Sequence, residues 1–61
     1  MKIVFKDCEP AHAREMVTWC RYNIGVYSED WNFDWTGNFE RDVEFTINDE
    51  QSFTLFLLRW T

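Results

Sequence analysis

Residues 29–47 read EDWNFDWTGNFERDVEFTI, and most of this stretch alternates between apolar and polar side chains. Trp31, Phe33 and Trp35 take the odd positions, and acidic or amide side chains take the even positions between them. After a Gly-Asn turn signal the alternation resumes and continues to Ile47. A period of two residues is that of a β-strand, so the stretch predicts a hairpin with one apolar and one acidic face.

The turn of this hairpin is predicted from the parity of its two strands. A two-residue loop would place Trp35 opposite Glu40, an apolar residue opposite an acid on the same face. A three-residue loop, Thr36–Asn38 with Asn38 in the left-handed conformation, avoids this. It predicts, on the apolar face, the pairs Trp35 with Phe39, Phe33 with Arg41 and Trp31 with Val43.

The same loop predicts the pairs of the acidic face, which are Asp34 with Glu40, Asn32 with Asp42 and Asp30 with Glu44. Two of these pairs bring like charges together, which destabilises a sheet slightly. A sheet under selection for stability alone would mix signs here, so this face is a candidate functional surface.

The segments before the hairpin predict a strand and then a helix. Residues 2–6 form the short strand. Pro10 fits the first turn of the helix, and Asn23 with Gly25 provides its stop. The apolar stripe of this helix has helical spacing and consists of Ala13, Met16, Val17, Cys20 and Ile24.

The C-terminal segment predicts a short helix, with Asn48 as N-cap and Gln51 in capping-box fashion. A strand through residues 52–60 is the competing interpretation, because several of these residues favour sheets. In a helix, Leu55 and Leu58 fall on the side opposite the other apolar residues, which indicates burial or a second contact such as a partner subunit. Those other residues are Phe53, Phe56, Leu57 and Trp60.

Length and charge limit the class of protein. With 61 residues, two glycines and one proline, the chain has room for one domain, residues 1–61, and none for a linker. It has neither a signal-peptide pattern nor an apolar run of membrane-spanning length, so we expect a soluble cytosolic protein without membrane contact.

Residues 1–28 carry a formal charge of +1 and residues 29–50 a formal charge of −7. This acidic field repels phosphates, which argues against direct nucleic-acid binding and favours a cationic partner surface.

Cys8, His12 and Cys20 are the residues to consider for metal binding or catalysis. The two cysteines would stand about 18 Å apart along one helix, too far for a disulfide. Cys8 and His12 have i, i+4 spacing, but no further ligands of zinc type follow, so neither a metal nor a cofactor is predicted. A catalytic cysteine also needs an orienting group and an oxyanion site. We expect Cys20 in the core, a free Cys8 thiol, a partly buried structural His12 and no enzymatic activity.

The last third of the chain carries a further pattern. The strand VEF at residues 43–45 leads through Asp49 and Glu50 to FTLFLLRW at residues 53–60, with F-x-L-x-W-like spacing. This pattern resembles the C-terminal pattern of short uncharacterised proteins of tailed bacteriophages. The resemblance implies a phage origin and a small α+β domain, and it carries over no catalytic residue. Because many such short phage products bind and disable a host protein, it also implies an inhibitor.

The order strand, helix, strand, strand, helix predicts an α+β fold, a three-stranded sheet with two helices on one face, ferredoxin-like but lacking the last strand. A right-handed crossover would place the first strand parallel to the third, with the third in the middle. The face covered by the helices would carry Ile3, Phe5, Trp31, Phe33, Phe45 and Ile47. The open face would be partly neutralised by two lysines; its charged residues would be Lys2, Lys6, Glu40, Asp42 and Glu44.

The predicted function is that of a non-enzymatic phage protein that binds and inhibits a host protein, such as a defence or nucleic-acid-handling factor, through its acidic face. The partner-binding residues would be Asp30, Asp34, Glu40, Asp42 and Glu44. The missing last strand leaves the first strand as a bare edge, which predicts a homodimer. Its interface residues would be Lys2, Val4, Lys6, Leu55 and Leu58.

Two other functions fit the sequence. One is a structural or oligomeric adaptor. The other is a protein that sequesters a nucleotide, which requires four arginines to converge on one pocket: Arg14, Arg21, Arg41 and Arg59. Aromatic residues are a further clue, because Trp and Tyr are enriched at interfaces. The candidates, which would otherwise only seal the edges of a thin core, are Trp19, Tyr22, Tyr27 and Trp60.

Overall fold

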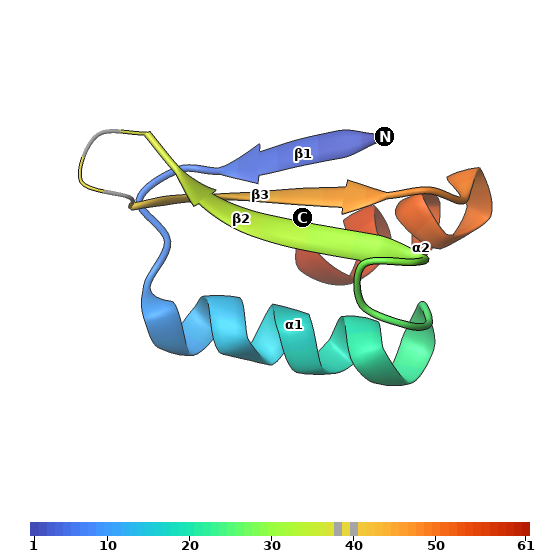
Figure 1. Ribbon diagram of the computed structural model, residues 1–61. Helices are drawn as coiled ribbons and strands as arrows, with labels where there is room; N and C mark the ends of the chain where they lie inside the picture. The colour runs from blue at the N-terminus through green and yellow to red at the C-terminus, as the bar shows by residue number, and fades with distance from the viewer. Residues whose placement is uncertain (38, 40) are drawn as a thin grey trace.

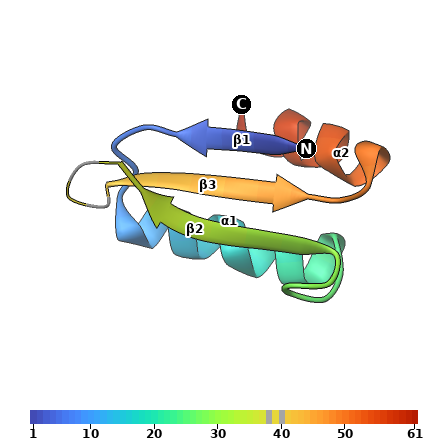
Figure 2. The same ribbon diagram turned by 45° about the horizontal axis from the view of Figure 1, so that its top comes forward.

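A computed structural model describes residues 1–37, 39 and 41–61 of the chain (Figure 1). Its elements are β1 (Lys2–Phe5), α1 (Pro10–Asn23), β2 (Trp31–Thr36), β3 (Asp42–Ile47) and α2 (Glu50–Trp60). The three strands form one sheet, and both helices lie on the same side of it (Figures 1 and 2). The predicted α+β class, with the order β-α-β-β-α and two helices on one face, is confirmed.

β3 is the central strand, and it runs antiparallel to both β1 and β2. The prediction of a central third strand is therefore confirmed, but the prediction that the first strand runs parallel to it is wrong. β1 and β2 point in the same direction, with β3 inserted between them (Figure 1). The connection through α1 thus joins two parallel strands that are not neighbours, which is the split βαβ arrangement of ferredoxin-like folds.

The register of the β2–β3 hairpin differs from the predicted one. The pairs on the apolar face are Trp31 with Ile47, Phe33 with Phe45 and Trp35 with Val43. Each partner therefore lies four residues further along the chain than expected. The predicted register set Phe33 opposite Arg41, whereas the observed one sets it opposite Phe45, with the two rings stacked and their centroids 5.9 Å apart. Apolar contact across the strands selected the longer loop.

The connection between the strands comprises residues 37–41 instead of three residues. Both loop lengths are odd, so every side chain stays on the predicted face and only its partner changes. The predicted left-handed Asn38 and the predicted pairing of Glu40 with Asp34 concern residues outside the described part of the chain. On the acidic face, Asp34 lies opposite Glu44.

The core lies between the sheet and the two helices. Along β3 every second residue is buried, as the sequence alternation predicts. The ring of Phe45 is central, with centroids 6.2 Å from Phe5, 5.9 Å from Phe33 and 5.0 Å from Phe56. The buried side chains are Ala13, Met16, Cys20, Trp31, Val43, Phe45, Ile47 and Phe56.

The ends of α1 follow the sequence signals. Pro10 occupies the first helical turn, where its missing N–H removes no helical hydrogen bond. Ile24 caps the C-terminus, and its N–H donates to the carbonyl oxygen of Cys20 at 2.8 Å. Gly25 follows with φ +149°, a conformation that L side chains rarely adopt, so the chain turns away from the helix here.

α2 is a helix, as predicted, and the competing strand is excluded. Its N-cap is Asp49, whose side chain accepts a hydrogen bond from the N–H of Ser52 at 2.9 Å, so the predicted Asn48 cap is wrong. The Asn48 side chain instead donates to the carbonyl oxygen of Glu29 at 2.7 Å and so holds the loop before β2.

The outer side of α2 carries two exposed leucines, as the helical spacing predicts. Leu55 is 54% exposed and Leu58 is 77% exposed. Within residues 1–37, 39 and 41–61, neither helix has the length and hydropathy that crossing a bilayer requires.

Candidate functional site

Within residues 1–37, 39 and 41–61, no helix or strand covers the side of the sheet opposite the helices (Figure 1). Its side chains alternate with those of the core and are polar apart from that of Val4. They are Lys2, Val4, Asn32, Asp34, Thr36, Asp42, Glu44 and Thr46. We call this surface the open face.

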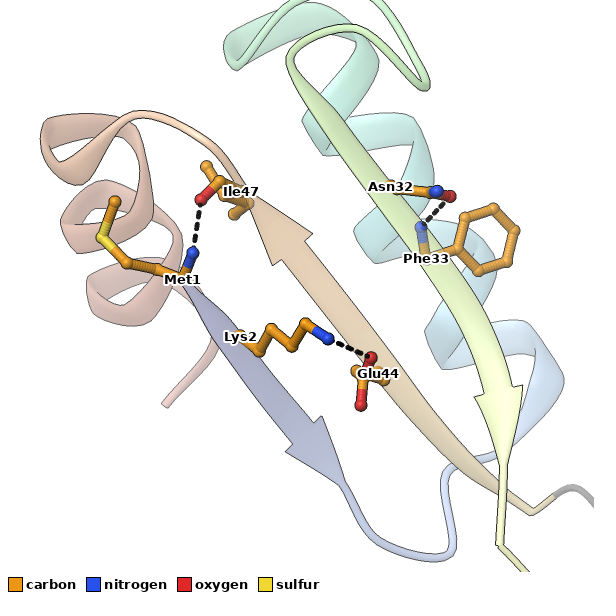
Figure 3. Close-up of polar contacts among 6 residues, drawn as sticks. All are labelled: Met1, Lys2, Asn32, Phe33, Glu44 and Ile47. Atoms are coloured by element: carbon orange, nitrogen blue, oxygen red, sulfur yellow. Dashed lines mark hydrogen bonds and ion pairs between the residues drawn. The ribbon is translucent and has the colours of Figure 1, made fainter.

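Two lysines neutralise the acids of β3 on the open face. Lys2 Nζ lies 3.7 Å from Glu44 Oε1 (Figure 3), and Lys6 Nζ lies 3.4 Å from Asp42 Oδ2. Asp42 also accepts a hydrogen bond from the backbone N–H of Asp7 at 2.9 Å. This hydrogen bond, together with the Lys6 ammonium, holds the pKa of the Asp42 carboxyl below its ordinary value. The prediction that lysines partly neutralise this face is confirmed for these two acids.

The uncompensated negative charge of the open face lies toward β2. Asp34 is exposed and lies directly opposite Glu44. In the described part of the chain, Asp34 belongs to none of the ion pairs, which join Lys2 with Glu44, Lys6 with Asp42 and Arg41 with Asp7. Its carboxylate is therefore free to meet a cation from another molecule.

The five predicted partner-binding acids do not form one cluster. The structure brings Asp34, Asp42 and Glu44 together on the open face. Asp30 lies in the loop before β2, where its carboxylate accepts a hydrogen bond from the N–H of Val26 at 2.7 Å. Glu40 lies outside the described residues. Asp30 and Asp42 thus support the fold locally, which leaves Asp34 and Glu44 as the surface pair.

The β1 edge of the sheet has outward backbone groups. Met1 N donates to the carbonyl oxygen of Ile47 at 3.1 Å, and Ile47 N donates back to Met1 at 2.9 Å (Figure 3). Such doubly bonded pairs alternate along an antiparallel ladder with pairs whose backbone groups point away. Ile3 therefore bonds to β3, and the N–H and C=O groups of Lys2 and Val4 point out of the sheet.

At the β2 edge, local groups bond two of the outward backbone groups, the carbonyl of Trp31 and the N–H of Phe33. The carbonyl oxygen of Trp31 accepts a hydrogen bond from the N–H of Ser28 at 2.7 Å. The N–H of Phe33 donates to the side-chain oxygen of Asn32 at 2.7 Å (Figure 3). The sequence pattern did not predict that Ser28 and Asn32 bond this edge. The signal for Asn32 was an amide inside a run of aromatic residues, since Asn is depleted in strands.

An open hollow of about 620 Å³ lies between α1 and the end of α2. Arg14 and Arg59 both line it, and the Arg59 guanidinium lies 4.2 Å from the centre of the Trp60 ring. Arg41 lies instead 3.7 Å from Asp7. Only two of the four arginines named for nucleotide binding thus share this hollow, since Arg21 does not line it either.

Three of the four aromatic residues named as interface candidates line the same hollow: Trp19, Tyr22 and Trp60. Tyr22 is 84% exposed. Tyr27 lies elsewhere, and its ring packs edge-to-face on Trp31 with centroids 5.2 Å apart. We call the hollow between α1 and the end of α2 the arginine–aromatic hollow.

The cysteines and His12 show no catalytic arrangement in the described part of the chain. The Cys8 thiol donates to the carbonyl oxygen of Glu9 at 3.5 Å, and burial together with the Glu9 carboxylate raises its pKa. A protonated thiol is a poor nucleophile. Cys20 is free and buried, as predicted, and burial raises its pKa to about 12. His12 is exposed, with its ring edge-to-face against Trp60 at 5.5 Å, so its predicted partial burial is wrong.

Metal-ligating side chains do not gather in groups of three or more within the described residues. Comparisons with protein-family models, with curated proteins and with solved structures find no match for this chain. The surfaces that bear on function are therefore the open face, the β1 edge and the arginine–aromatic hollow.

Proposed function

We propose that this chain is a non-enzymatic bacteriophage accessory protein that binds a host protein in the host cytoplasm and inhibits it. In this proposal the contact surface is the acidic half of the open face. The observation that carries it is the placement of Asp34 directly opposite Glu44, on a side of the sheet that no helix covers. The resemblance of the C-terminal segment to short phage proteins supports the phage origin and the inhibitory role.

The charge distribution indicates the kind of partner. Lys2 and Lys6 hold the β1 side of the open face near neutrality, so the excess negative charge lies around Asp34. Carboxylates on a rigid sheet steer encounter with a cationic surface, and salt weakens this steering. The neighbours of Asp34 along β2 are the polar residues Asn32 and Thr36 on this face. A basic, largely polar surface on the host protein fits this arrangement.

The test uses a pair of isosteric substitutions. Asp34→Asn combined with Glu44→Gln removes two charges from the open face, keeps the shape of both side chains and breaks only the exposed ion pair of Glu44 with Lys2. Asp42 stays unchanged because its carboxylate holds Asp7 and Lys6. The matched control, Glu9→Gln with Glu29→Gln, removes the same charge outside the open face, and neither side chain forms a cap or an ion pair among the described residues.

The partner is first identified by capture from host lysate on the wild-type protein. The rate at which it associates with the wild type and with each variant is then measured at low and high salt. We expect the Asp34/Glu44 variant to associate at least about tenfold more slowly at low salt, because steering is lost. The control variant should keep the wild-type rate. If the Asp34/Glu44 variant binds and inhibits as well as the wild type, the open face is only a solvated surface and the proposal fails.

A second candidate function is sequestration of a small anionic aromatic ligand such as a nucleotide, and the arginine–aromatic hollow favours it. Arg14 and Arg59 supply donors for a phosphate or carboxylate, and the neighbouring rings supply stacking surfaces. Titrating nucleotides while recording tryptophan fluorescence tests this function, because Trp19 and Trp60 line the hollow. Binding that is lost in Arg14→Gln with Arg59→Gln supports it, and an unchanged wild-type signal excludes it.

A further inference from the structure

We infer that β1 pairs antiparallel with β1 of a second copy, so that two three-stranded sheets become one continuous sheet around a twofold axis. The basis is the set of N–H and C=O groups of Lys2 and Val4 that point out of the sheet. Unpaired edges of this kind attract another strand. The inference goes beyond the proposed function and does not depend on it, since an oligomeric adaptor would need the same contact.

The outward groups and the side chains together select one register. If Lys2 pairs with Val4 of the second copy, each of the two symmetric pairs exchanges both of its hydrogen bonds. A shift by two residues in either direction sets Lys2 opposite Lys6 or opposite Lys2 of the other copy. Opposed like charges destabilise a sheet, so these two registers are disfavoured.

The selected register also matches apolar side chains on the side that the helices cover. It sets Ile3 opposite Ile3 of the second copy and Met1 opposite Phe5. Met1 is 44% exposed, and Ile3 and Phe5 are only partly buried within one chain. Pairing would cover these side chains with each other and would extend the core across the twofold axis.

α2 supplies further apolar surface on the same flank. It lies along the β1 side of the sheet, whereas α1 lies along the β2 side (Figures 2 and 3). Leu55 and Leu58 of this helix are exposed and would add apolar surface to a contact on this flank. A second copy fits best because Ile3 then meets its own equivalent and no like charges face each other.

The first experiment blocks the edge without touching the fold of one chain. Val4→Pro removes the outward N–H and no hydrogen bond to β3, and proline is tolerated at sheet edges. Val4→Ala is the matched control, because it shortens the side chain and keeps the N–H. The molecular mass of each variant is measured by light scattering over a dilution series that reaches high micromolar concentration.

We expect twice the mass of one chain for the wild type and for Val4→Ala. Val4→Pro should raise the dimer dissociation constant about tenfold or more, because each dimer loses two hydrogen bonds. A wild type that stays monomeric over the whole series overturns the inference. So does a dimer that Val4→Pro leaves intact, which would place the contact elsewhere. A wild-type monomer whose edge is occupied by a strand of another protein also overturns it.

Two readouts do not depend on the folding of Val4→Pro. In the wild type, the amide hydrogen of Val4 should exchange slowly at concentrations where the dimer forms and fast on dilution, while the Ile3 amide stays protected throughout.

The register is tested by cysteine cross-linking in a Cys8→Ser background. Ile3→Cys should form an intermolecular disulfide, because directly opposed residues of this type have Cα atoms roughly 4.5 Å apart. Val4→Cys should not, because its equivalent lies on the diagonal, roughly 7–8 Å away. The reverse pattern, or an exchange rate of Val4 independent of concentration, overturns the inference.

Discussion

The two edges of the sheet differ in how their outward backbone groups are bonded. At the β2 edge, the N–H of Ser28 bonds to the carbonyl oxygen of Trp31, and the Asn32 side chain accepts from the N–H of Phe33. At the β1 edge, the side chains of Lys2 and Lys6 turn to the open face and pair with acids of β3. Lysine on an edge strand opposes pairing, and here an acid of β3 lies beside each of the two lysines and reduces this effect. The comparison shows that loops and side chains, and not the strand alone, decide whether the outward backbone groups of an edge are bonded. An edge strand with lysines can therefore still present unbonded groups.

Substitution of Trp31, which bonds to the loop before β2, is expected to have the greatest effect on stability. Trp31 is 1% exposed, and its indole N–H donates to the carbonyl oxygen of Gly25 at 3.0 Å. Trp31→Ala should lower the free energy of unfolding by about 3–5 kcal/mol, because it leaves a cavity in the core. A domain at the lower end of ordinary stability, about 5 kcal/mol, would keep only about 0–2 kcal/mol. Urea denaturation followed by circular dichroism measures this loss.

Trp31→Phe is the matched control, because it keeps an aromatic ring while it removes the hydrogen bond to Gly25 and part of the ring volume. Its expected cost is about 1–3 kcal/mol, less than that of Trp31→Ala. Equal losses in the two variants would mean that the part of the indole that phenylalanine lacks carries the whole contribution of Trp31.

An intermediate effect on stability is expected when the Asn32 side chain, which bonds one outward group of the β2 edge, is removed. Asn32→Ala removes the acceptor of the Phe33 N–H and should cost about 0.5–1 kcal/mol. Amide exchange at Phe33 should become faster, and association into species larger than a dimer should increase, because one more outward group of the β2 edge is then unbonded. Asn32→Asp, which keeps an oxygen acceptor, should behave as the wild type. Unchanged exchange at Phe33 in Asn32→Ala would show that the side chain does not protect this edge.

A pH-dependent effect is expected at the β1 side, where Asp42 holds the N–H of Asp7. The folded pKa of Asp42 lies below its ordinary value of 3.8, so its charge stabilises the folded state at neutral pH. This contribution is lost as the pH falls through the folded pKa. Asp42→Asn should therefore be less stable than the wild type at neutral pH, and the difference should close in the acid range. Thermal unfolding over a pH series measures it, and a difference independent of pH contradicts the assignment.

The smallest effect is expected on the open face. Asp34 lies opposite Glu44, and relief of this repulsion by Asp34→Asn should raise the melting temperature slightly. Asp34→Glu keeps the charge and should leave the melting temperature unchanged. A lower melting temperature in Asp34→Asn would reveal a structural partner of Asp34 and would argue against its role in binding.

Much of the fold follows from local patterns. The alternation of residues 31–35 and 43–47 predicted the strands and their faces, and the stripe through Met16 and Cys20 predicted the buried side of α1. Loops of three and of five residues keep every side chain on the same face, so the alternation could not decide between them. The predicted hairpin register was therefore wrong by four residues. The N-cap of α2 was wrong by one residue, because Asn48 bonds to a loop that is distant in sequence.

The candidate site was predictable in part. Charge counting located the acids of the hairpin, but it could not show that Asp30 bonds to Val26 or that Asp42 bonds to Asp7. Nor could it show which arginines share a hollow, because Arg14 and Arg59 come from different helices. These features depend on contacts between segments far apart in the chain.

Local patterns in the chain were enough to predict the α+β class, the face on which each strand residue lies, the buried stripe of α1 and the acidic character of the hairpin. Each of these depends on the periodicity or composition of one segment, which local backbone geometry converts directly into structure. The direction of β1, the hairpin register and the difference between the two edges could not be predicted in this way. These depend on which backbone groups of distant segments meet, and the packing of Phe45 against Phe33 and Phe56 selects among arrangements that are locally equivalent.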